Sequence, residues 1–214
     1  MSNIKLVVFD MDGTLLQPRS SWAQIHDHFG TDNTEMLRLY IDHKITDEEF
    51  VKADIKLWNS NSKKTVNEEY INSIMDKIKP LKGAEILIKE LHKKNIKTVI
   101  LSGGIQYLAD RWMNKWNMDY ALANELIDDD KGNLTAIINS SGHNKGPMMD
   151  KIIKKYNYKK NQVAAVGDTI VDIPMFDRAG LAIAVNTDDK KVIEKADYHL
   201  KGDLRELKNL IIKW

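Results

Sequence analysis

A chain of 214 residues is long enough to bury one substantial core and to carry a second, smaller module beside it. Its 32 basic and 31 acidic residues leave a formal net charge of +1, so no basic field predicts binding to nucleic acid or to an anionic membrane. The absence of cysteine excludes disulfides and thiolate metal sites, and the first apolar run is far shorter than a membrane span and lacks signal-peptide features; we therefore expect a cytoplasmic protein.

Strand and helix patterns alternate along most of the chain. Short apolar runs that give way at once to polar or glycine-rich residues predict buried strands at residues 6–9, 98–101, 163–166 and 181–185. Amphipathic patterns predict helices over residues 84–94, 106–116, 147–156 and 204–212. This alternation predicts an α/β fold with a doubly wound parallel sheet, in which ligands bind beyond the carboxyl ends of the strands.

The interval of residues 17–80 breaks the alternation, because it shows helix signals and no strand pattern. The capping signals are Ser20 or Ser21, then Thr46 with Glu49, and Thr65 with Glu68. We expect these residues to form an all-helical domain inserted above the active end of the sheet. The sheet domain would then comprise residues 1–16 and 81–214.

A second, smaller insertion is predicted within residues 127–138. The segment from Asp130 to Asn133 is typical of a tight turn between two short strands, which indicates a small β-hairpin. The acidic run at residues 128–130 lacks the spacing of a calcium-binding loop, so we interpret it as a solvated turn.

Two aspartates stand one residue apart at the end of the first predicted strand. Asp10 follows the apolar run directly, Asp12 comes after one intervening residue, and Gly13 allows the backbone to turn sharply there. A carboxylate held by a rigid strand is suited to attack phosphorus, while Asp12 has the reach to protonate a leaving alkoxide and later to deprotonate water. The pair predicts phosphoryl transfer through an acyl phosphate.

Three later segments supply the cations and hydrogen-bond donors that such a reaction needs. Asp168 and Asp172 follow another buried strand, and their hard oxygen atoms suit Mg²⁺ beside a phosphoryl group. The Ser102 hydroxyl and the Gly103 amide follow the second strand, where we expect them to hold phosphate oxygens. Lys145 stands at a helix start, where its ammonium would balance developing negative charge.

Taken singly, several of these residues are also compatible with structural roles. Asp172 fits a solvated loop residue, Ser102 a helix cap and Lys145 an exposed lysine, although a cation at a helix start opposes the helix dipole. His26 and His28 lie two residues apart and point to different sides of a helix, so we interpret both as structural.

The segments Asp10-Met-Asp-Gly-Thr-Leu15, Ser102-Gly-Gly104, Lys145 and Gly167-Asp168 with Asp172 resemble, in order, the four motifs of the haloacid dehalogenase (HAD) superfamily. The helical insertion is similar in position to that family's C1 caps, and the later run "DIPMFDRAGLAIAVN" resembles its phosphoserine phosphatase branch. The resemblance implies a Rossmann-like core and phosphatase activity. It also implies these roles: Asp10 as nucleophile, Asp12 as general acid/base, the Asp10 side chain, Asp12 carbonyl, Asp168 and Asp172 for Mg²⁺, and Ser102 and Lys145 for the phosphoryl group.

Two departures from the family pattern weaken the expectation of phosphoserine as substrate. That branch usually carries a glutamate shortly after the first motif, whereas Arg19 stands in the corresponding stretch here, and Val171 replaces the usual asparagine of the fourth motif. Arg19 is either a surface residue or a substrate ligand; as a ligand, its guanidinium would contact a carboxylate or second phosphate of the substrate. Trp22 either faces the same pocket or packs in the core.

The leading functional hypothesis is a Mg²⁺-dependent phosphomonoesterase acting on a small phosphorylated metabolite. A phosphotransferase or phosphomutase with the same covalent step is the first alternative, since sequence alone does not separate water from an alcohol as acceptor. A receiver-like phosphoacceptor is the second, but it would need neither Asp12 nor a helical cap. The sequence gives no indication of the oligomeric state.

Overall fold

The computed structural model describes residues 3–140 and 145–214. In chain order its strands are β1 (Leu6–Phe9), β2 (Lys97–Ile105), β3 (Tyr120–Asp128), β4 (Leu134–Ile137), β5 (Val163–Gly167), β6 (Leu181–Val185) and β7 (Tyr198–Leu200). Its α-helices are α1 (Ser21–Phe29), α2 (Thr34–Ile41), α3 (Asp47–Asn61), α4 (Glu68–Met75), α5 (Ala84–His92), α6 (Gln106–Trp116), α7 (Lys145–Tyr156), α8 (Ile173–Phe176), α9 (Lys190–Lys195) and α10 (Leu207–Lys213). Short 3₁₀ turns are η1 (Lys160–Gln162), η2 (Ile170–Asp172) and η3 (Leu204–Glu206).

The strands form one sheet in the order β4-β3-β2-β1-β5-β6-β7. All neighbours are parallel except β4, which runs antiparallel to β3. At the centre, Phe9 of β1 stands in register with Ile100 of β2 and with Val166 of β5. Because parallel strands end at the same edge, the residues that follow β1, β2 and β5 are brought together there.

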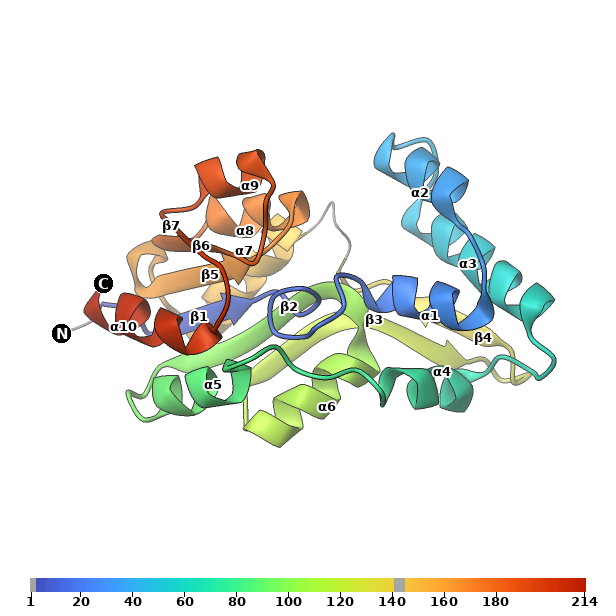
Figure 1. Cartoon of the computed structure of the whole chain (residues 1–214), viewed down its shortest axis with the longest axis horizontal. Helices are drawn as coiled ribbons and strands as arrows, with labels where there is room; N and C mark the ends of the chain where they lie inside the picture. Colours follow the sequence, from blue (N-terminus) through green and yellow to red (C-terminus); the bar gives the residue numbers. More distant parts are fainter. Residues whose placement is uncertain (1–2, 141–144) are drawn as a thin grey trace.

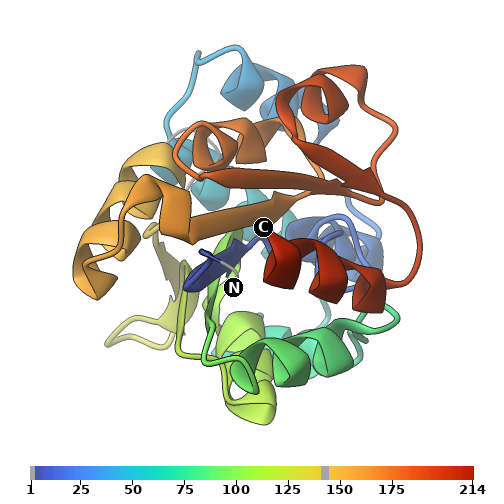
Figure 2. The ribbon, with the colours of Figure 1, turned by 90° about the vertical axis from the view of Figure 1, so that its left-hand side faces the viewer.

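Helices cover both faces of the sheet, as the burial of every residue of β1 requires. Val7 and Phe9 belong to the apolar cluster that includes residues of α5, α6 and α10, while Leu6 and Val8 belong to the cluster with α7, α8 and α9. Figure 1 shows α5 and α6 below β1 and β2, and α8 and α9 above β5, and Figure 2 shows the helical layers on opposite sides of the sheet. The predicted α/β fold with a mostly parallel, doubly wound sheet is confirmed.

Residues between β1 and α5 contain the four helices α1 to α4, which lie together at one side of the molecule in Figure 1. The chain leaves and returns at one place, since the Gln17 amide donates to the Lys79 carbonyl (3.0 Å) and the Leu81 amide donates to the Leu15 carbonyl (2.8 Å). Two backbone connections therefore run side by side at the base of this helical segment.

Two of the three predicted helix starts in this segment are confirmed. The Ser20 side chain accepts from the Ala23 amide, and Thr46 forms a reciprocal capping box with Glu49. The predicted box of Thr65 with Glu68 is wrong, because α4 takes Asn67 as its N-cap, with the Asn67 side chain accepting from the Tyr70 amide at 2.9 Å. The intervening Val66 is buried in the apolar core, which keeps the chain extended until Asn67.

The predicted hairpin is formed by β3 and β4, but β3 also extends into the main sheet, where it pairs with β2. The turn is closed by the Asp129 amide, which donates to the Asn133 carbonyl at 2.8 Å, and Gly132 adopts a positive φ of 77°. The first half of β3 pairs with β2 in the main sheet and its second half pairs with β4. This dual role, together with β7, α8 and α9, was not predicted from the sequence.

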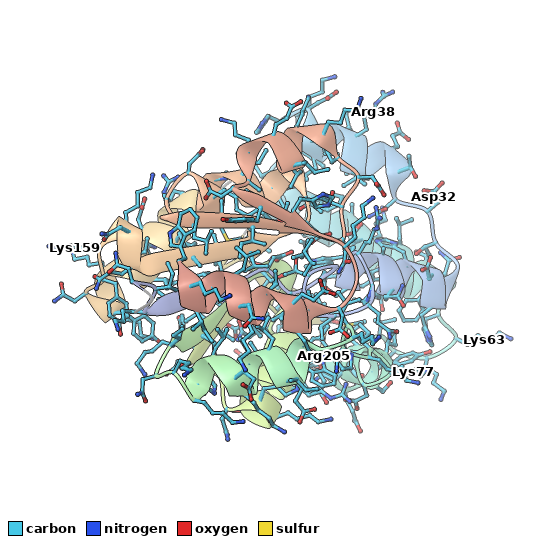
Figure 3. All side chains as sticks on the ribbon, turned by 60° about the vertical axis from the view of Figure 1, so that its left-hand side comes forward. Asp32, Arg38, Lys63, Lys77, Lys159 and Arg205 are labelled. Atoms are coloured by element: carbon cyan, nitrogen blue, oxygen red, sulfur yellow. The ribbon has the colours of Figure 1, made fainter. Side chains whose placement is uncertain are left out.

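Charged side chains of both signs cover the outer surface. In Figure 3, Arg38, Lys63 and Lys159 point away from the ribbon on different sides of the molecule. Among the residues that the structure describes, no helix combines the length and the apolar character needed to cross a membrane.

Candidate active site

Three carboxylates converge at the carboxyl edge of the sheet. Asp10 directly follows β1, and its amide donates to the Val166 carbonyl of β5 at 2.9 Å; Asp168 directly follows β5. Asp172 is added by the 3₁₀ turn η2. One oxygen from each of these buried residues lies within 4.8 Å of the oxygens of the other two. The carboxylates predicted to hold a metal are therefore neighbours in space.

A tight turn after β1 fits closely against this cluster. Gly13 has a φ of 75°, and a Cβ at this position would lie 2.3 Å from Asp168 Oδ2. The next residue, Thr14, donates its hydroxyl to Asp168 Oδ1 at 2.8 Å, and it is fully buried. Sequence reasoning assigned no role to Thr14, although its place beside Gly13 in the turn is a signal that could have suggested one.

Asp172 is fixed on several sides. Its Oδ2 accepts from the amides of Asp168 (3.0 Å) and Thr169 (2.9 Å), and its Oδ1 accepts from Lys145 Nζ (2.6 Å). A Cβ on Gly167 would lie 2.5 Å from the Cβ of Asp172, so only glycine fits there without displacing this side chain. Asp172 is thus a buried member of the cluster, and the solvated-loop interpretation is wrong.

Lys145 supplies the positive charge at the centre of the cluster. It begins α7, its side chain is 1% exposed, and Nζ also donates to Asp10 Oδ1 at 2.7 Å. Burial by itself would lower the pKa of Lys145, but the negative charges of Asp10 and Asp172 outweigh burial and raise its pKa above the ordinary value. An exposed helix-start lysine, the alternative interpretation, is excluded.

One ammonium does not neutralise three carboxylates. Burial raises the pKa of Asp10 to about 7, although Lys145 partly opposes this effect, and burial together with the charges of Asp10 and Asp172 raises the pKa of Asp168 to about 8. The cluster therefore requires further positive charge to be fully ionised near neutral pH. Its donor set of clustered carboxylate oxygens fits a hard divalent cation such as Mg²⁺.

Asp12 lies beside the cluster and has one oxygen available. Its Oδ2 accepts from the Ser21 amide at 2.6 Å, at the start of α1, whereas Oδ1 is buried and has no hydrogen-bond partner among the described residues. Burial raises the pKa of Asp12, and hydrogen bonds from Ser21 oppose the rise. A carboxyl with a raised pKa and one unpartnered oxygen is suited to exchange a proton with a bound molecule.

Ser102 and Gly103 lie where β2 reaches the same edge. Ser102 is buried, and its hydroxyl oxygen accepts from the Gly104 amide at 3.1 Å, so it does not cap α6. The Gly103 carbonyl accepts from Trp22 Nε1 and from Asn124 Nδ2, both at 2.9 Å. Asn124, on β3, thus supports the segment that the sequence predicts to bind phosphate, and nothing in the local sequence pointed to Asn124.

The structure separates the two residues expected to read the substrate. Trp22 lies in α1 and lines a cavity of ≈ 350 Å³ that also reaches Gly103 and Lys145. Arg19 is exposed and is not among the described residues that line this cavity. It lies close enough to Asp188 to contribute to the lowered pKa of that carboxyl, after the larger effect of Lys201. The geometry therefore gives no support to a substrate contact by Arg19.

His26 has structural partners away from the carboxylate cluster. Its ring is buried, with Nδ1 2.7 Å from the Thr31 hydroxyl and 3.2 Å from Trp58 Nε1, and with Nε2 3.2 Å from Asp54 Oδ1. His28, by contrast, is exposed and contacts the Tyr70 hydroxyl. These contacts hold α1, α3 and α4 together, which agrees with the structural interpretation of both histidines.

Comparison with known sequences gives a consistent family. A sequence model described as haloacid dehalogenase-like hydrolase matches residues 4–180. The phosphoserine phosphatase of Methanocaldococcus jannaschii is 31% identical over 95% of this chain and 95% of its own length. The phosphoserine phosphatase of Campylobacter jejuni subsp. doylei is 30% identical over 97% of this chain and 98% of its own.

Solved structures agree with the sequence relatives. A structure described as a phospho-aspartyl intermediate analogue of phosphoserine phosphatase superposes with a TM-score of 0.79 at 31% identity, covering 97% of this chain and 99% of the other. The matching architecture extends over both the sheet and the helical segment between β1 and α5.

Proposed function

Because the chain belongs to the haloacid dehalogenase-like hydrolase family, we propose that it is a Mg²⁺-dependent phosphomonoesterase that works through phospho-Asp10. The observation that carries the proposal is the buried cluster of Asp10, Asp168 and Asp172 around Lys145. Asp12 Oδ1, which has no hydrogen-bond partner among the described residues, stands beside this cluster. Such an arrangement offers a nucleophile, a proton carrier and a cation site within one pocket.

In the first half-reaction, a carboxylate oxygen of Asp10 attacks phosphorus, and the bond between phosphorus and the substrate alkoxide breaks. Asp12 gives its proton to the departing alkoxide, so the alcohol leaves neutral and Asp12 becomes a carboxylate. In the second half-reaction, Asp12 takes a proton from water as the water oxygen attacks the phosphorus of phospho-Asp10. Phosphate leaves, the Asp10 carboxylate is restored, and Asp12 is protonated again.

The oxygens of Asp10, Asp168 and Asp172 would hold the cation, together with the Asp12 carbonyl that the family resemblance implies. When bound, Mg²⁺ supplies positive charge that offsets the repulsion between the phosphate and the carboxylates. Thr14 keeps Asp168 in place through its hydroxyl, and the amides of Asp168 and Thr169 keep Asp172 in place. We assign binding of the transferring phosphoryl group to Ser102, the Gly103 amide and Lys145.

We also propose that residues 17–80 form a cap domain on a core of residues 1–16 and 81–214. Support comes from the paired connection at Gln17 and Lys79, which gives the helical segment a single base. Further support comes from Ser21, whose amide binds Asp12, and from Trp22, whose indole donates to Gly103. These contacts link α1 to the reacting groups, so movement of the segment would open or close the pocket.

The substrate in this proposal is a small phosphorylated metabolite, and the reaction resembles that of the phosphoserine phosphatases named among the relatives. We propose water rather than an alcohol as the acceptor of the phosphoryl group, because those relatives are named as phosphatases. A phosphotransferase would show itself by passing phosphate to an added alcohol.

The test is steady-state hydrolysis of phenyl phosphate, followed by acid quenching to trap protein-bound phosphate. We expect activity with Mg²⁺, loss of activity in excess chelator and recovery when Mg²⁺ is restored. Asp10→Asn should neither turn over nor become phosphorylated, whereas Asp130→Asn in the exposed hairpin turn should behave as the unmodified protein. Full activity in chelator, or protein-bound phosphate trapped on Asp10→Asn, would contradict the proposal.

A further inference from the structure

The cavity beside the carboxylate cluster is mostly apolar. It measures ≈ 350 Å³ and shares Lys145 and Gly103 with the phosphoryl site, so a bound phosphate monoester would extend its organic part into it. The apolar walls come from the helical segment and from residues near the hairpin and η2. They include the aromatic residues Trp22, Tyr40 and Phe50 and the aliphatic residues Leu37, Val51 and Ile138.

The charges around this cavity are few. Among the described residues that line it, Lys145 is the one cation, and its ammonium already contacts Asp10 and Asp172. The one acid is Asp47, which accepts a hydrogen bond from the Tyr40 hydroxyl at 2.6 Å. The uncharged polar lining residues Ser20, Asn33 and Asn124 are already hydrogen-bonded to Ala23, Asp54 and Gly103. A substrate carboxylate in this space would therefore meet a negative charge, apolar walls and occupied polar groups, without a dedicated basic partner among those residues.

A second, larger hollow of ≈ 670 Å³ is a weaker candidate for the substrate. It is lined by residues of α1 and by the segment around Ile78, and its described lining includes neither Gly103 nor Lys145. Gln17 and Lys79, which form the base of the helical segment, contribute to it. Of these two cavities, the smaller is the one that Lys145 lines, as far as the described part of the chain shows.

Resting on the phosphatase function proposed above, we propose that the preferred substrate is a phosphate monoester of an alcohol with an apolar body and no second anionic group. Val171, which also lines the cavity, extends the apolar surface toward the carboxylate cluster. Burial of apolar substrate atoms against these walls favours binding, whereas burial of an unpaired carboxylate opposes it. Phosphoserine, which carries a carboxylate, is disfavoured on this argument.

The first experiment compares four substrates that form a complete set. Ethyl phosphate, phosphoethanolamine, 3-phosphooxypropanoate and phosphoserine share a two-carbon frame and differ only by an ammonium, a carboxylate or both. We expect each carboxylate-bearing compound to have a kcat/KM about tenfold or more below its partner without the carboxylate, because the anion would be buried without a cation. Ethyl, butyl and hexyl phosphate should show kcat/KM rising by up to about fourfold for each methylene buried.

The second experiment introduces a basic side chain at the edge of the cavity by mutation. Leu37 lines the cavity from α2 and is 40% exposed, so Leu37→Arg places a guanidinium at its edge without opening the core. Ile41→Arg is the matched control, since Ile41 lies on the same helix, is 61% exposed and does not line the cavity. Leu37→Arg should raise kcat/KM for 3-phosphooxypropanoate relative to ethyl phosphate by about tenfold, the usual scale of a charge-assisted contact. Ile41→Arg should leave this ratio unchanged.

The outcomes separate this inference from the proposed function. Hydrolysis of phenyl phosphate with preference for the carboxylate-bearing compounds would overturn the inference and leave the phosphatase intact. An alkyl series without any rise in kcat/KM would also overturn it. Failure to hydrolyse phenyl phosphate or any member of the set with Mg²⁺ would overturn the phosphatase function itself. The comparison in the unmodified protein does not depend on whether either variant folds.

Discussion

Replacement of Lys145 by methionine should destabilise the protein in a strongly pH-dependent way. Lys145 is 1% exposed and lies 2.7 Å from Asp10 and 2.6 Å from Asp172. Methionine keeps much of the side-chain volume but removes the charge that both carboxylates face. Removal of one partner from a buried ion pair costs about 3–5 kcal/mol when the other stays charged. We expect a loss of this size in the free energy of unfolding at pH 8 in chelator.

The pH dependence follows from the carboxyl groups that remain. The pKa of Asp10 is already raised to about 7 by burial, and Lys145 partly opposes this rise, so its removal raises that pKa further. An acid with a raised folded-state pKa binds more protons in the folded protein, so stability falls as pH rises from the unfolded value toward the folded one. Each additional unit of pKa costs about 1.4 kcal/mol above that window. At pH 5 Asp10 and Asp168 are protonated, and the loss should shrink to about 1–2 kcal/mol from hydrogen bonds alone.

Urea unfolding followed by tryptophan fluorescence measures the loss at both pH values. Lys154→Met provides the control, because Lys154 lies on the same helix and is exposed. Its effect should stay within about 0.5 kcal/mol at either pH. An equal loss for Lys145→Met at pH 5 and pH 8, or a loss at pH 8 no larger than that of the control, would refute the account of Lys145 as the charge that balances the cluster.

Three further predictions concern the same cluster. Asp12→Asn should lower kcat for phenyl phosphate by about 10²–10⁴-fold through loss of proton transfer, and unchanged turnover in a steady-state assay would contradict the assignment. Gly13→Ala, whose Cβ would lie 2.3 Å from Asp168 Oδ2, should lower the melting temperature and weaken stabilisation by Mg²⁺; calorimetry showing neither effect would count against the packing argument. Since the pKa values of Asp10 and Asp168 are raised to about 7 and about 8, saturating Mg²⁺ should raise the melting temperature more at pH 8 than at pH 5, and a larger rise at pH 5 would exclude binding to ionised carboxylates.

Local sequence determined several of the helices and strands that position the candidate site residues. The apolar run before Asp10, followed by a glycine-containing turn, predicts a buried strand, and β1 is that strand, ending just before Asp10. The amphipathic pattern of residues 106–116 and the Thr46–Glu49 capping box were likewise readable, because each depends on residues within a few turns of helix. The three-residue strand β7 gave no such signal, since it lacks an apolar run and is a strand only by pairing with β6.

Tertiary structure alone decided how distant side chains meet. Lys145 contacts Asp10 across 135 positions of sequence, and this contact turns a residue that alone reads as a surface lysine into the centre of a buried cluster. Asn124 supports Gly103 only because β3 lies beside β2. Arg19 and Trp22 stand three residues apart at the entrance to α1, yet the indole lines the cavity while Arg19 lies on the exposed surface. The direction of a side chain at such a junction is set by the packing of the whole helical segment, and residue type and spacing do not encode it by themselves.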